Sequence, residues 1–330
     1  MTTQKLNEAL FIPLVTIVCM IVFCVDTNVA LAQGGPFPSK PISLTIGSNP
    51  GSSSEVPTRA LAKAAEKILG QPIVCSNAPG AAGARALGQV LKAEPDGYTL
   101  VNVNLAGQIT SIVEKLNYRV PDDFTPIIQF QTIPLPFAVR NDAPWKTWEE
   151  LIKYTREHKG KVIVGIFGSK GTPWLVLNQI EKSENVKFVY APYAGGGKAV
   201  TAILGGHVTA TVIVSAIRYA KSGELRLLLV FSDQRLKSFP DVPTAKELYG
   251  PEGVGFGGGS NGILATKGLP KPILTRLHDA FKKAMEDQDF IKVCESFDLV
   301  ISYRNPEEFA KVLKRTDDVV RDFLREEAKQ

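Results

Sequence analysis

The sequence predicts an α/β fold, and the order of segments near its N-terminal end carries that prediction. Apolar strand-like segments alternate with amphipathic helix-like segments over residues 42–46, 56–69, 73–75, 84–91 and 98–103. Glycine- and proline-rich loops stand where each strand passes into a helix. This alternation is typical of a mostly parallel sheet with helices on both faces.

The first predicted helix, 56–69, has the clearest end signals. Its apolar residues recur at helical spacing on one face, and its charged residues lie on the other. Pro57 falls in the first turn, where its missing N–H has no cost, and Gly70 ends the helix. The loop before it, 47–54, is therefore expected at the positive end of a helix.

A second α/β unit is expected after Asp123. Its predicted strands are 127–130, 137–139, 162–166, 187–190, 208–214 and 225–231. Its predicted helices are 148–158, a helix that begins near residue 172, and 198–204. Thr172 is expected to cap the second of these helices, with Pro173 in its first turn. The glycine tract 253–262 and the apolar 263–265 fit a return to the first unit. Closing helices are predicted over 272–285 and 306–326, the latter capped by Asn305.

The first 32 residues have the features of a secretory signal peptide. Lys5 precedes an apolar run over 9–25, and Ala30, Leu31 and Ala32 form a small-x-small site before Gln33. The alternative is a retained membrane anchor, but the run is shorter than the ~20 residues that a spanning helix needs. We therefore predict export and cleavage after Ala32.

Removal of this leader leaves Cys75 and Cys294 in an oxidising compartment. They form one disulfide or stay two unpaired thiols, and sequence spacing does not decide between these alternatives. The formal charge changes from +5 to +6, because one basic and two acidic residues leave. A mild positive excess fits weak attraction of anionic solutes, and no block of Lys and Arg indicates a nucleic-acid partner.

Short motifs follow one another along nearly the whole chain after the leader. They are SKPI (39–42), NPG (49–51), LGQPIV (69–74), APGAAGA (78–84), PDGYTL (95–100), DFTPI (123–127), APYAGGGKAV (191–200), SFPDVPTAKEL (238–248) and KGLPKPI (267–273). Each motif is short, but their combined order and spacing are specific. The chain resembles Bug-type receptors, the extracytoplasmic solute-binding components of tripartite tricarboxylate transporters.

The resemblance implies a two-lobed periplasmic-binding-protein fold, type II-like, with a ligand cleft between the lobes. We place a discontinuous first lobe at 33–131 and 258–330, and a second lobe at 132–257. The implied partners are a small organic carboxylate and the large and small membrane permease subunits of the transporter. We expect a periplasmic monomer that needs no cofactor and no metal.

The chain departs from the family pattern in its first loop. Family members usually carry PGG, a small residue, Thr or Ser, and then Asp after the first strand. Here the order is Pro50, Gly51, Ser52, Ser53, Ser54 and Glu55. Serine hydroxyls add donors and acceptors and remove backbone freedom relative to glycine. The ligand can therefore differ from the family's commoner carboxylates.

Three apparent catalytic motifs fail on their context. Residues 258–262 match G-x-S-x-G around Ser260, but no Asp or Glu lies between Gly262 and His278. The G-x-G-x-x-G match that begins at Gly253 follows no buried strand, and Lys198 lacks the hydroxyl residue that a phosphate loop needs next. The three histidines of the chain are widely separated, so a metal site is not indicated.

The remaining candidates are loops that open helices and offer backbone N–H groups to an anion. The resemblance implies that backbone amides and bridging waters, rather than an arginine, hold the carboxylate. A further loop is expected over 105–108. The predicted ligand-binding residues are Asn49, Pro50, Gly51, Ser52, Ser53, Ser54, Ala106, Gly107, Phe167, Gly168, Ser169, Gly171, Thr172, Tyr193, Ala194, Gly195 and Gly196.

An ordinary tight turn is the alternative interpretation of each loop taken alone. For the whole protein we predict a receptor that closes its lobes around a small carboxylate and delivers it to a permease. The alternatives are a secreted serine hydrolase that uses Ser260, and an orphan sensory binding protein that works with a signalling partner. Stoichiometric binding without turnover would exclude the hydrolase.

Overall fold

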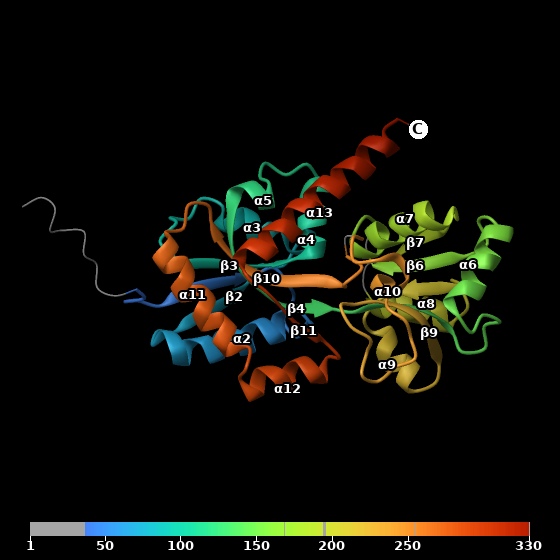
Figure 1. Ribbon diagram of the computed structural model, residues 1–330, viewed down its shortest axis with the longest axis horizontal. Helices are drawn as coiled ribbons and strands as arrows, with labels where there is room; N and C mark the ends of the chain where they lie inside the picture. The colour runs from blue at the N-terminus through green and yellow to red at the C-terminus, as the bar shows by residue number, and fades with distance from the viewer. Residues whose placement is uncertain (1–36, 168, 194–195, 254, 330) are drawn as a thin grey trace, which may run out of the picture. The chain divides into compact units, whose positions relative to one another are not determined.

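The computed structural model describes residues 37–167, 169–193, 196–253 and 255–329. The predicted signal peptide lies outside these residues. From Lys40 onward the chain forms one unit, and its described residues build two β-sheets (Figure 1). Among the described residues, no helix has both the length and the apolar character needed to cross a membrane.

Within the described residues the first sheet has six strands, in the order β11-β4-β10-β3-β1-β2. β1 pairs in parallel with β2 and β3, whereas β10 runs antiparallel to both β3 and β4, and β11 runs antiparallel to β4. The strands are β1 Ile42–Ile46, β2 Ile73–Asn77, β3 Thr99–Asn104, β4 Phe124–Ile133, β10 Gly259–Thr266 and β11 Val300–Arg304. The expectation of a mostly parallel sheet is therefore wrong here, because strands from the C-terminal part of the chain insert with the opposite direction.

Helices cover both faces of this sheet. α3, α4, α5 and α13 lie on one face, and α2, α11 and α12 lie on the other (Figure 1). Their bounds are α2 Glu55–Leu69, η2 Ala81–Gly83, α3 Ala84–Val90, α4 Leu105–Val113, α5 Val120–Asp123, α11 Lys271–Ala284, α12 Gln288–Ser296 and α13 Pro306–Glu327.

The second sheet, again within the described residues, has five strands in the order β7-β6-β8-β5-β9. β6 is parallel to β7 and β8, and β5 is antiparallel to β8 and β9. The strands are β5 Leu135–Arg140, β6 Ile163–Phe167, β7 Val189–Tyr193, β8 Ala210–Val212 and β9 Leu225–Phe231. The helices are α6 Trp148–Glu157, α7 Thr172–Glu184, α8 Gly196–Leu204, α9 Ala216–Lys221 and α10 Ala245–Tyr249.

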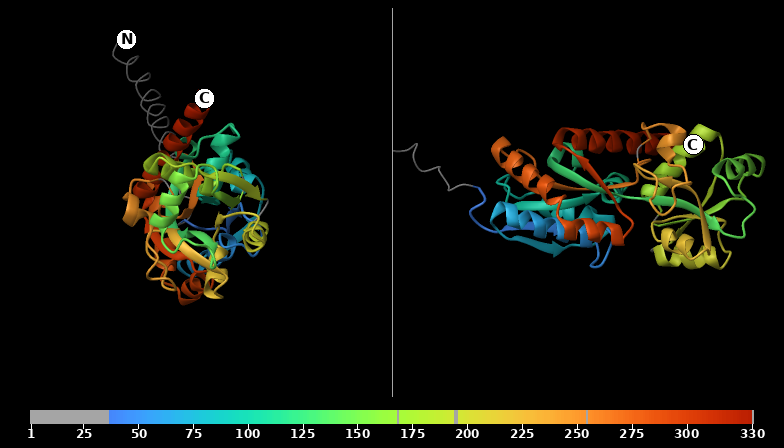
Figure 2. Two further views of the ribbon diagram at one scale, coloured as in Figure 1. Left: turned by 90° about the vertical axis from the view of Figure 1, so that its right-hand side faces the viewer. Right: turned by 60° about the horizontal axis from the view of Figure 1, so that its bottom comes forward.

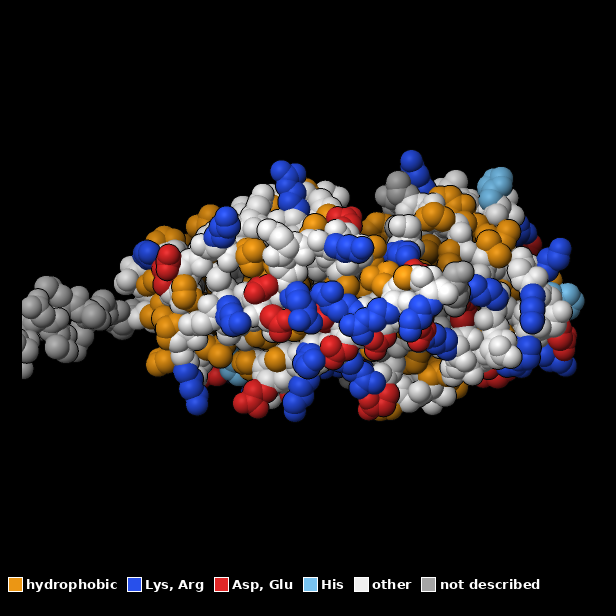
Figure 3. All heavy atoms as spheres, turned by 90° about the horizontal axis from the view of Figure 1, so that it is seen from above, with side chains coloured by type: hydrophobic (Ala, Val, Ile, Leu, Met, Phe, Trp, Pro, Cys, Tyr) orange, Lys and Arg blue, Asp and Glu red, His pale blue; other side chains and the backbone are white. Residues whose placement is uncertain are grey.

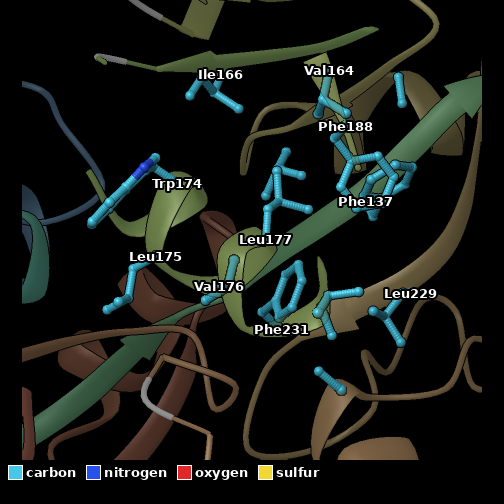
Figure 4. Close-up of a cluster of buried hydrophobic side chains, with 14 of the residues drawn as sticks. Phe137, Val164, Ile166, Trp174, Leu175, Val176, Leu177, Phe188, Leu229 and Phe231 are labelled. Carbon is cyan, nitrogen blue, oxygen red and sulfur yellow. The ribbon is translucent and has the colours of Figure 1, made fainter. Parts of the chain in front are cut away.

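Strand β5 shows how the second sheet carries a core on each face. Phe137 and Val139 point into a cluster shared with α6 and α7, while Ala138 points into the cluster under α8 and α9, as the two-residue period of a strand requires. Figure 4 shows Phe137 beside Phe188 in the first cluster, where their ring centroids are 6.0 Å apart. Both faces of the sheet are therefore buried.

The two sheets belong to two lobes that the chain joins between β4 and β5 and between β9 and β10. α13 adds a further connection, because its C-terminal end reaches α7 of the second lobe (Figure 2). Phe323 lies 6.1 Å from Trp174 between ring centroids, and Lys170 Nζ lies 2.5 Å from Glu327 Oε2. On the face seen in Figure 3, acidic side chains are interspersed among the basic ones.

Several predicted helix ends are confirmed and others are corrected. Gly70 ends α2 in the left-handed conformation, and Asn305 caps α13 together with Glu308. Thr172 is not a cap: Gly171 occupies that position and Thr172 is the first helical residue. The expected loop 105–108 is instead the first turn of α4, because Asn104 caps a helix there.

The elements that escaped the sequence analysis are η2, α4, α5, α9, α10, α12 and β11. The predicted lobe boundary at 131/132 falls inside β4, and the one at 257/258 falls just before β10. The division of the chain at those two positions stays a prediction.

Candidate functional site

A cavity of about 730 Å³ lies between the two lobes. Its first-lobe wall comes from the ends of β1 and β3 and from the loops that follow them, and its second-lobe wall comes from the ends of β6 and β8. The lining residues are Gly47, Ser48, Asn49, Ser52, Ser53, Ser54, Pro79, Gly80, Ala82, Asn104, Leu105, Ala106, Ile133, Leu135, Phe167, Thr172, Pro173, Gly196, Val212, Ile213, Val214, Ser215, Gly259 and Ser260.

Ser54 fixes the serine loop, residues 52–54, to the sheet beneath it. It precedes α2, and its hydroxyl has one proton to share between two acceptors, Asn261 Oδ1 at 3.1 Å and Asn102 Oδ1 at 3.3 Å. Its carbonyl accepts from Thr58 Oγ1 at 2.6 Å. Ser54 is buried, so its hydroxyl supports the loop from below.

Buried amides from three strands complete this support. Asn102 of β3 donates through Nδ2 to Asn261 Oδ1 of β10 at 2.7 Å, and Gln131 of β4 donates through Nε2 to the Ser53 carbonyl at 3.1 Å. All three amides are buried. Buried polar groups are costly unless hydrogen-bonded, so a satisfied network of this kind holds its members in one arrangement.

Ser52 and Ser53 differ from Ser54 in where their hydroxyls go. Ser52 Oγ accepts from the Glu55 N–H at 3.2 Å, which satisfies one of the free amides at the start of α2. The Ser53 hydroxyl has no hydrogen bond to the described residues, although Ser53 lines the cavity. Ser53 is thus the serine of this loop whose side chain is available to a ligand.

Glu55 occupies the first turn of α2, and its negative charge is balanced by an ion pair with Arg59. Burial raises the pKa of Glu55, but hydrogen bonds from Arg59 and from the Gly51 N–H, together with the Arg59 charge, leave that pKa below its usual value. Arg59 also donates to the Cys75 carbonyl at 3.1 Å. The Gly51 amide is therefore committed to Glu55 rather than offered to the cavity, with an N···Oε2 distance of 3.0 Å.

Glycines bring the loops of the first lobe close together. A Cβ on Gly47 would stand 2.7 Å from Gly83 Cα, and one on Gly107 would stand 3.1 Å from the Ala82 carbonyl oxygen. Side chains at these positions would push the loops apart. The Gly107 N–H donates to Asn104 Oδ1 at 2.8 Å, so it serves the cap of α4.

The second-lobe wall is largely apolar. Phe167 at the end of β6 keeps 40% of its surface exposed although it is a large aromatic residue. Val212 and Ile213 follow from the end of β8, and the hydroxyl of Ser215 is buried without a hydrogen-bond partner in the described part of the chain. Hydroxyl and amide side chains lie mainly on the opposite, first-lobe wall.

The structure brings some of the predicted residues to the cavity and leaves others away from it. Those on the wall are Asn49, Ser52, Ser53, Ser54, Ala106, Phe167, Thr172 and Gly196. Those off the wall are Pro50, Gly51, Gly107, Ser169, Gly171 and Tyr193. Gly168, Ala194 and Gly195 lie outside the described residues. Tyr193 packs instead against the apolar cluster under α8.

Sequence reasoning missed other wall residues. Pro79, Gly80 and Ala82 line the cavity and belong to the APGAAGA motif, none of whose residues is among the predicted ligand-binding residues. Residues 213–215 follow a strand that ends two residues earlier than predicted. The hydrogen-bond network beneath the serine loop could have been predicted from polar residues, such as Asn102, that interrupt apolar strands.

The described residues of the site do not form the catalytic arrangements that the rejected motifs would require. Ser260 is the second residue of paired strand β10, opposite Thr132, and not on a strand-to-helix turn. Cys75 and Cys294 are free thiols, and burial raises their pKa values to about 11 and about 12. Among the described residues, no group of three or more potential metal-ligating side chains occurs.

Comparison with known proteins shows the family of this chain. The model of the tripartite tricarboxylate transporter family receptor (TctC) matches residues 58–325. The chain belongs to this family. TctC receptors are solute-binding proteins rather than enzymes, and the α/β fold with two lobes and two mixed sheets is that of periplasmic binding proteins.

Individual relatives agree with this assignment. The chain is 36% identical over 289 residues to a UPF0065 protein in the gbd 5′ region of Cupriavidus necator, covering 87% of each protein. It is 30% identical to a TctC solute-binding protein from Polaromonas, with a TM-score of 0.78 and coverage of 88% of this chain and 100% of the other. MatC from Rhodopseudomonas palustris, whose structure holds malate, is 27% identical with a TM-score of 0.67, over 86% of this chain and 100% of MatC.

Proposed function

We propose that this receptor captures a small carboxylate-containing solute in the periplasm and presents it to the membrane subunits of a tripartite transporter. The observation that carries the proposal is the serine loop. It stands at the N-terminus of the 15-residue helix α2, is supported by buried amides, and lines a cavity between two lobes. The Glu55 and Val56 N–H groups of α2 are bonded to Ser52, so the support that the helix N-terminus gives to an anion comes from its dipole.

The chemistry of the loop fits a carboxylate held by neutral groups. Ser53 offers a free hydroxyl, and the described lining residues include no arginine or lysine. The MatC relative with bound malate supports a carboxylate as the class of ligand. Because both lobes contribute to the wall, a ligand that touches both would favour the closed arrangement, which is what the membrane partner would recognise.

Thermal-shift measurements on the mature receptor test this proposal. A panel of small carboxylates is compared with the matching primary amides, which keep the size but lose the negative charge. We expect at least one acid to raise the melting temperature while its amide does not. Equal shifts for acid and amide, or no shift with any acid, would contradict carboxylate capture.

A further inference from the structure

We propose that a small inorganic anion with a single charge, such as chloride or nitrate, binds in a second cavity of this protein. The cavity is lined by the connection between β9 and β10 and by parts of β4, β11 and α13 of the first lobe. Leu105 and Ser260 border both this cavity and the ligand cavity. The anion site lies outside the proposed carboxylate site and does not depend on it.

The volume of the second cavity, about 110 Å³, limits what it can hold. Pockets for organic ligands usually measure about 300–1,000 Å³, and the ligand cavity, at about 730 Å³, falls in that range. A water molecule occupies about 30 Å³ in the liquid. The second cavity therefore has room for a small ion and a little water, but not for a carboxylate with a carbon body.

Ionised side chains line the second cavity, in contrast to the described lining of the ligand cavity. The cationic ones are Lys246, Arg304 and Arg315, and the anionic ones are Asp233 and Glu252. Arg315 and Glu252 form an ion pair with each other, and both side chains are well exposed. Once this neutral pair is set aside, the described lining carries two cations and one carboxylate.

Asp233 cannot balance both of the remaining cations. Its Oδ1 forms a close ion pair with Lys246 Nζ, and Arg304 Nη2 stands 3.4 Å from the same oxygen. The exposed fraction is 13% for the Asp233 side chain and 25% for each of the two basic side chains. One positive charge is therefore in excess at a place where salt and water screen it less than at the open surface.

Hydrogen-bond donors accompany this excess charge. A guanidinium carries five N–H groups, and within the described residues the Arg304 side chain donates only to Asp233. The hydroxyl of Thr132 is buried without a partner in the described part of the chain, and Thr132 lines the cavity. Buried polar groups are nearly always hydrogen-bonded. An anion in the cavity would accept from both residues.

The connection packs closely against the charged groups. A Cβ on Gly257 would stand 2.5 Å from Asp233 Oδ1 and 3.0 Å from Lys246 Cε. A side chain at this position would therefore displace the ion pair. Ser302 of β11 donates to Asp233 Oδ2 at 2.7 Å and holds the carboxylate from the side of the first lobe. The charges are thus fixed in place before an anion arrives.

The balance of charge selects the valence of the anion. An anion with one charge offsets the one excess cation, and its bonds from a guanidinium are of the strong, charge-assisted kind. A divalent anion such as sulfate would leave a negative charge beside the carboxylates of Asp233 and Glu252, which is unfavourable in a partly buried site. We therefore expect chloride and nitrate to bind more tightly than sulfate.

Chlorine NMR of the mature receptor in sodium chloride tests the proposal, because chloride that exchanges with a protein site gains line width. We expect an excess line width that saturates with chloride and that added nitrate removes, whereas sulfate at equal ionic strength removes it less. Arg304→Gln should weaken chloride binding by about tenfold or more, because hydrogen bonds to charged groups are the stronger ones. Thr132→Val, which keeps the shape of the side chain, should weaken it by roughly fivefold.

Arg325→Gln is the matched control. Arg325 lies in α13, its side chain is exposed, and it pairs with Asp322 away from the second cavity. This variant should keep the chloride affinity of the parent. An equal loss in Arg304→Gln and Arg325→Gln would mean that net charge alone attracts chloride, and it would overturn the site. Parent-like binding in both Arg304→Gln and Thr132→Val would overturn it as well.

Crystals soaked in bromide and measured at the bromine absorption edge locate the anion. We expect an anomalous peak in the second cavity, beside the Arg304 guanidinium. A map without a peak there overturns the proposal. A peak that is not matched by saturable line width in solution means binding at crystal concentration only, and it also overturns the proposal. These outcomes leave the capture of a carboxylate untouched, since the comparison of acids with amides tests that function separately.

Discussion

Ser53 and Ser54 are adjacent serines with opposite expected roles. Ser54→Ala removes a buried donor and leaves Asn102 Oδ1 without its partner, while Asn261 Oδ1 keeps the bond from Asn102 Nδ2 at 2.7 Å. Leaving one buried acceptor unsatisfied costs about 1–3 kcal/mol. We therefore expect Ser54→Ala to lower the free energy of unfolding by about that amount.

Ser53→Ala should show the reverse pattern. Its hydroxyl has no partner among the described residues, so the free energy of unfolding should stay within about 0.5 kcal/mol of the parent. Ligand binding should weaken by about 1 kcal/mol, roughly fivefold in Kd, which is the usual net value of one hydrogen bond.

Two measurements on each variant separate these roles. Urea unfolding reports stability, and calorimetry with the carboxylate that raises the melting temperature most reports binding. Ser43→Ala, at an exposed position of β1, is the control and should change neither. Parent-like unfolding of Ser54→Ala would refute the structural role of the network, and parent-like binding of Ser53→Ala would leave the serine loop as only a turn.

Three further predictions follow from the surroundings of the site. Gly51 has φ +79° with open space around its missing side chain, so Gly51→Val should cost about 1–3 kcal/mol in urea unfolding through backbone strain, whereas Gly51→Asn should cost less. Burial raises the pKa of Asp233, but bonds from Lys246 and Ser302 and the Arg304 charge hold it below 3.8. The stability that Asp233 contributes is therefore present above its usual pKa and lost as the pH falls through the lowered value, so the unfolding difference between the parent and Asp233→Asn should shrink in acid; a constant difference would contradict this. Cys75 and Cys294 should react slowly with Ellman's reagent at pH 8 in the folded protein and fully after denaturation, because their pKa values lie at about 11 and about 12.

Local patterns allowed much of the fold to be predicted. The helix of residues 55–69 was expected almost residue for residue, because its apolar spacing, Pro57 and Gly70 act within a few residues of one another. Strand direction was not predicted, since β10 joins β3 and β4 from a distant part of the sequence. The short helices α9 and α10 escaped because their few turns carry little periodic signal.

The site could be predicted only where the chain's own loops define it. Asn49 and residues 52–54 stand on the cavity wall because a loop between a strand and a helix has a fixed place at the end of a parallel strand. The second-lobe wall of the cavity depends on how the two lobes approach each other. No local pattern around Val212 or Leu135 distinguishes a cavity wall from an ordinary core.

The support of the serine loop shows what an interrupted strand can indicate. β3, β4 and β10 each carry a buried amide, at Asn102, Gln131 and Asn261. A buried amide needs a partner: Asn102 donates to Asn261, and Gln131 donates to the Ser53 carbonyl. Asn261 does pair across the ladder with Gln131, and it accepts from Ser54, 207 positions earlier in the chain. The position of the serine loop therefore depends in part on β10, a strand that the chain adds only after the second lobe is complete.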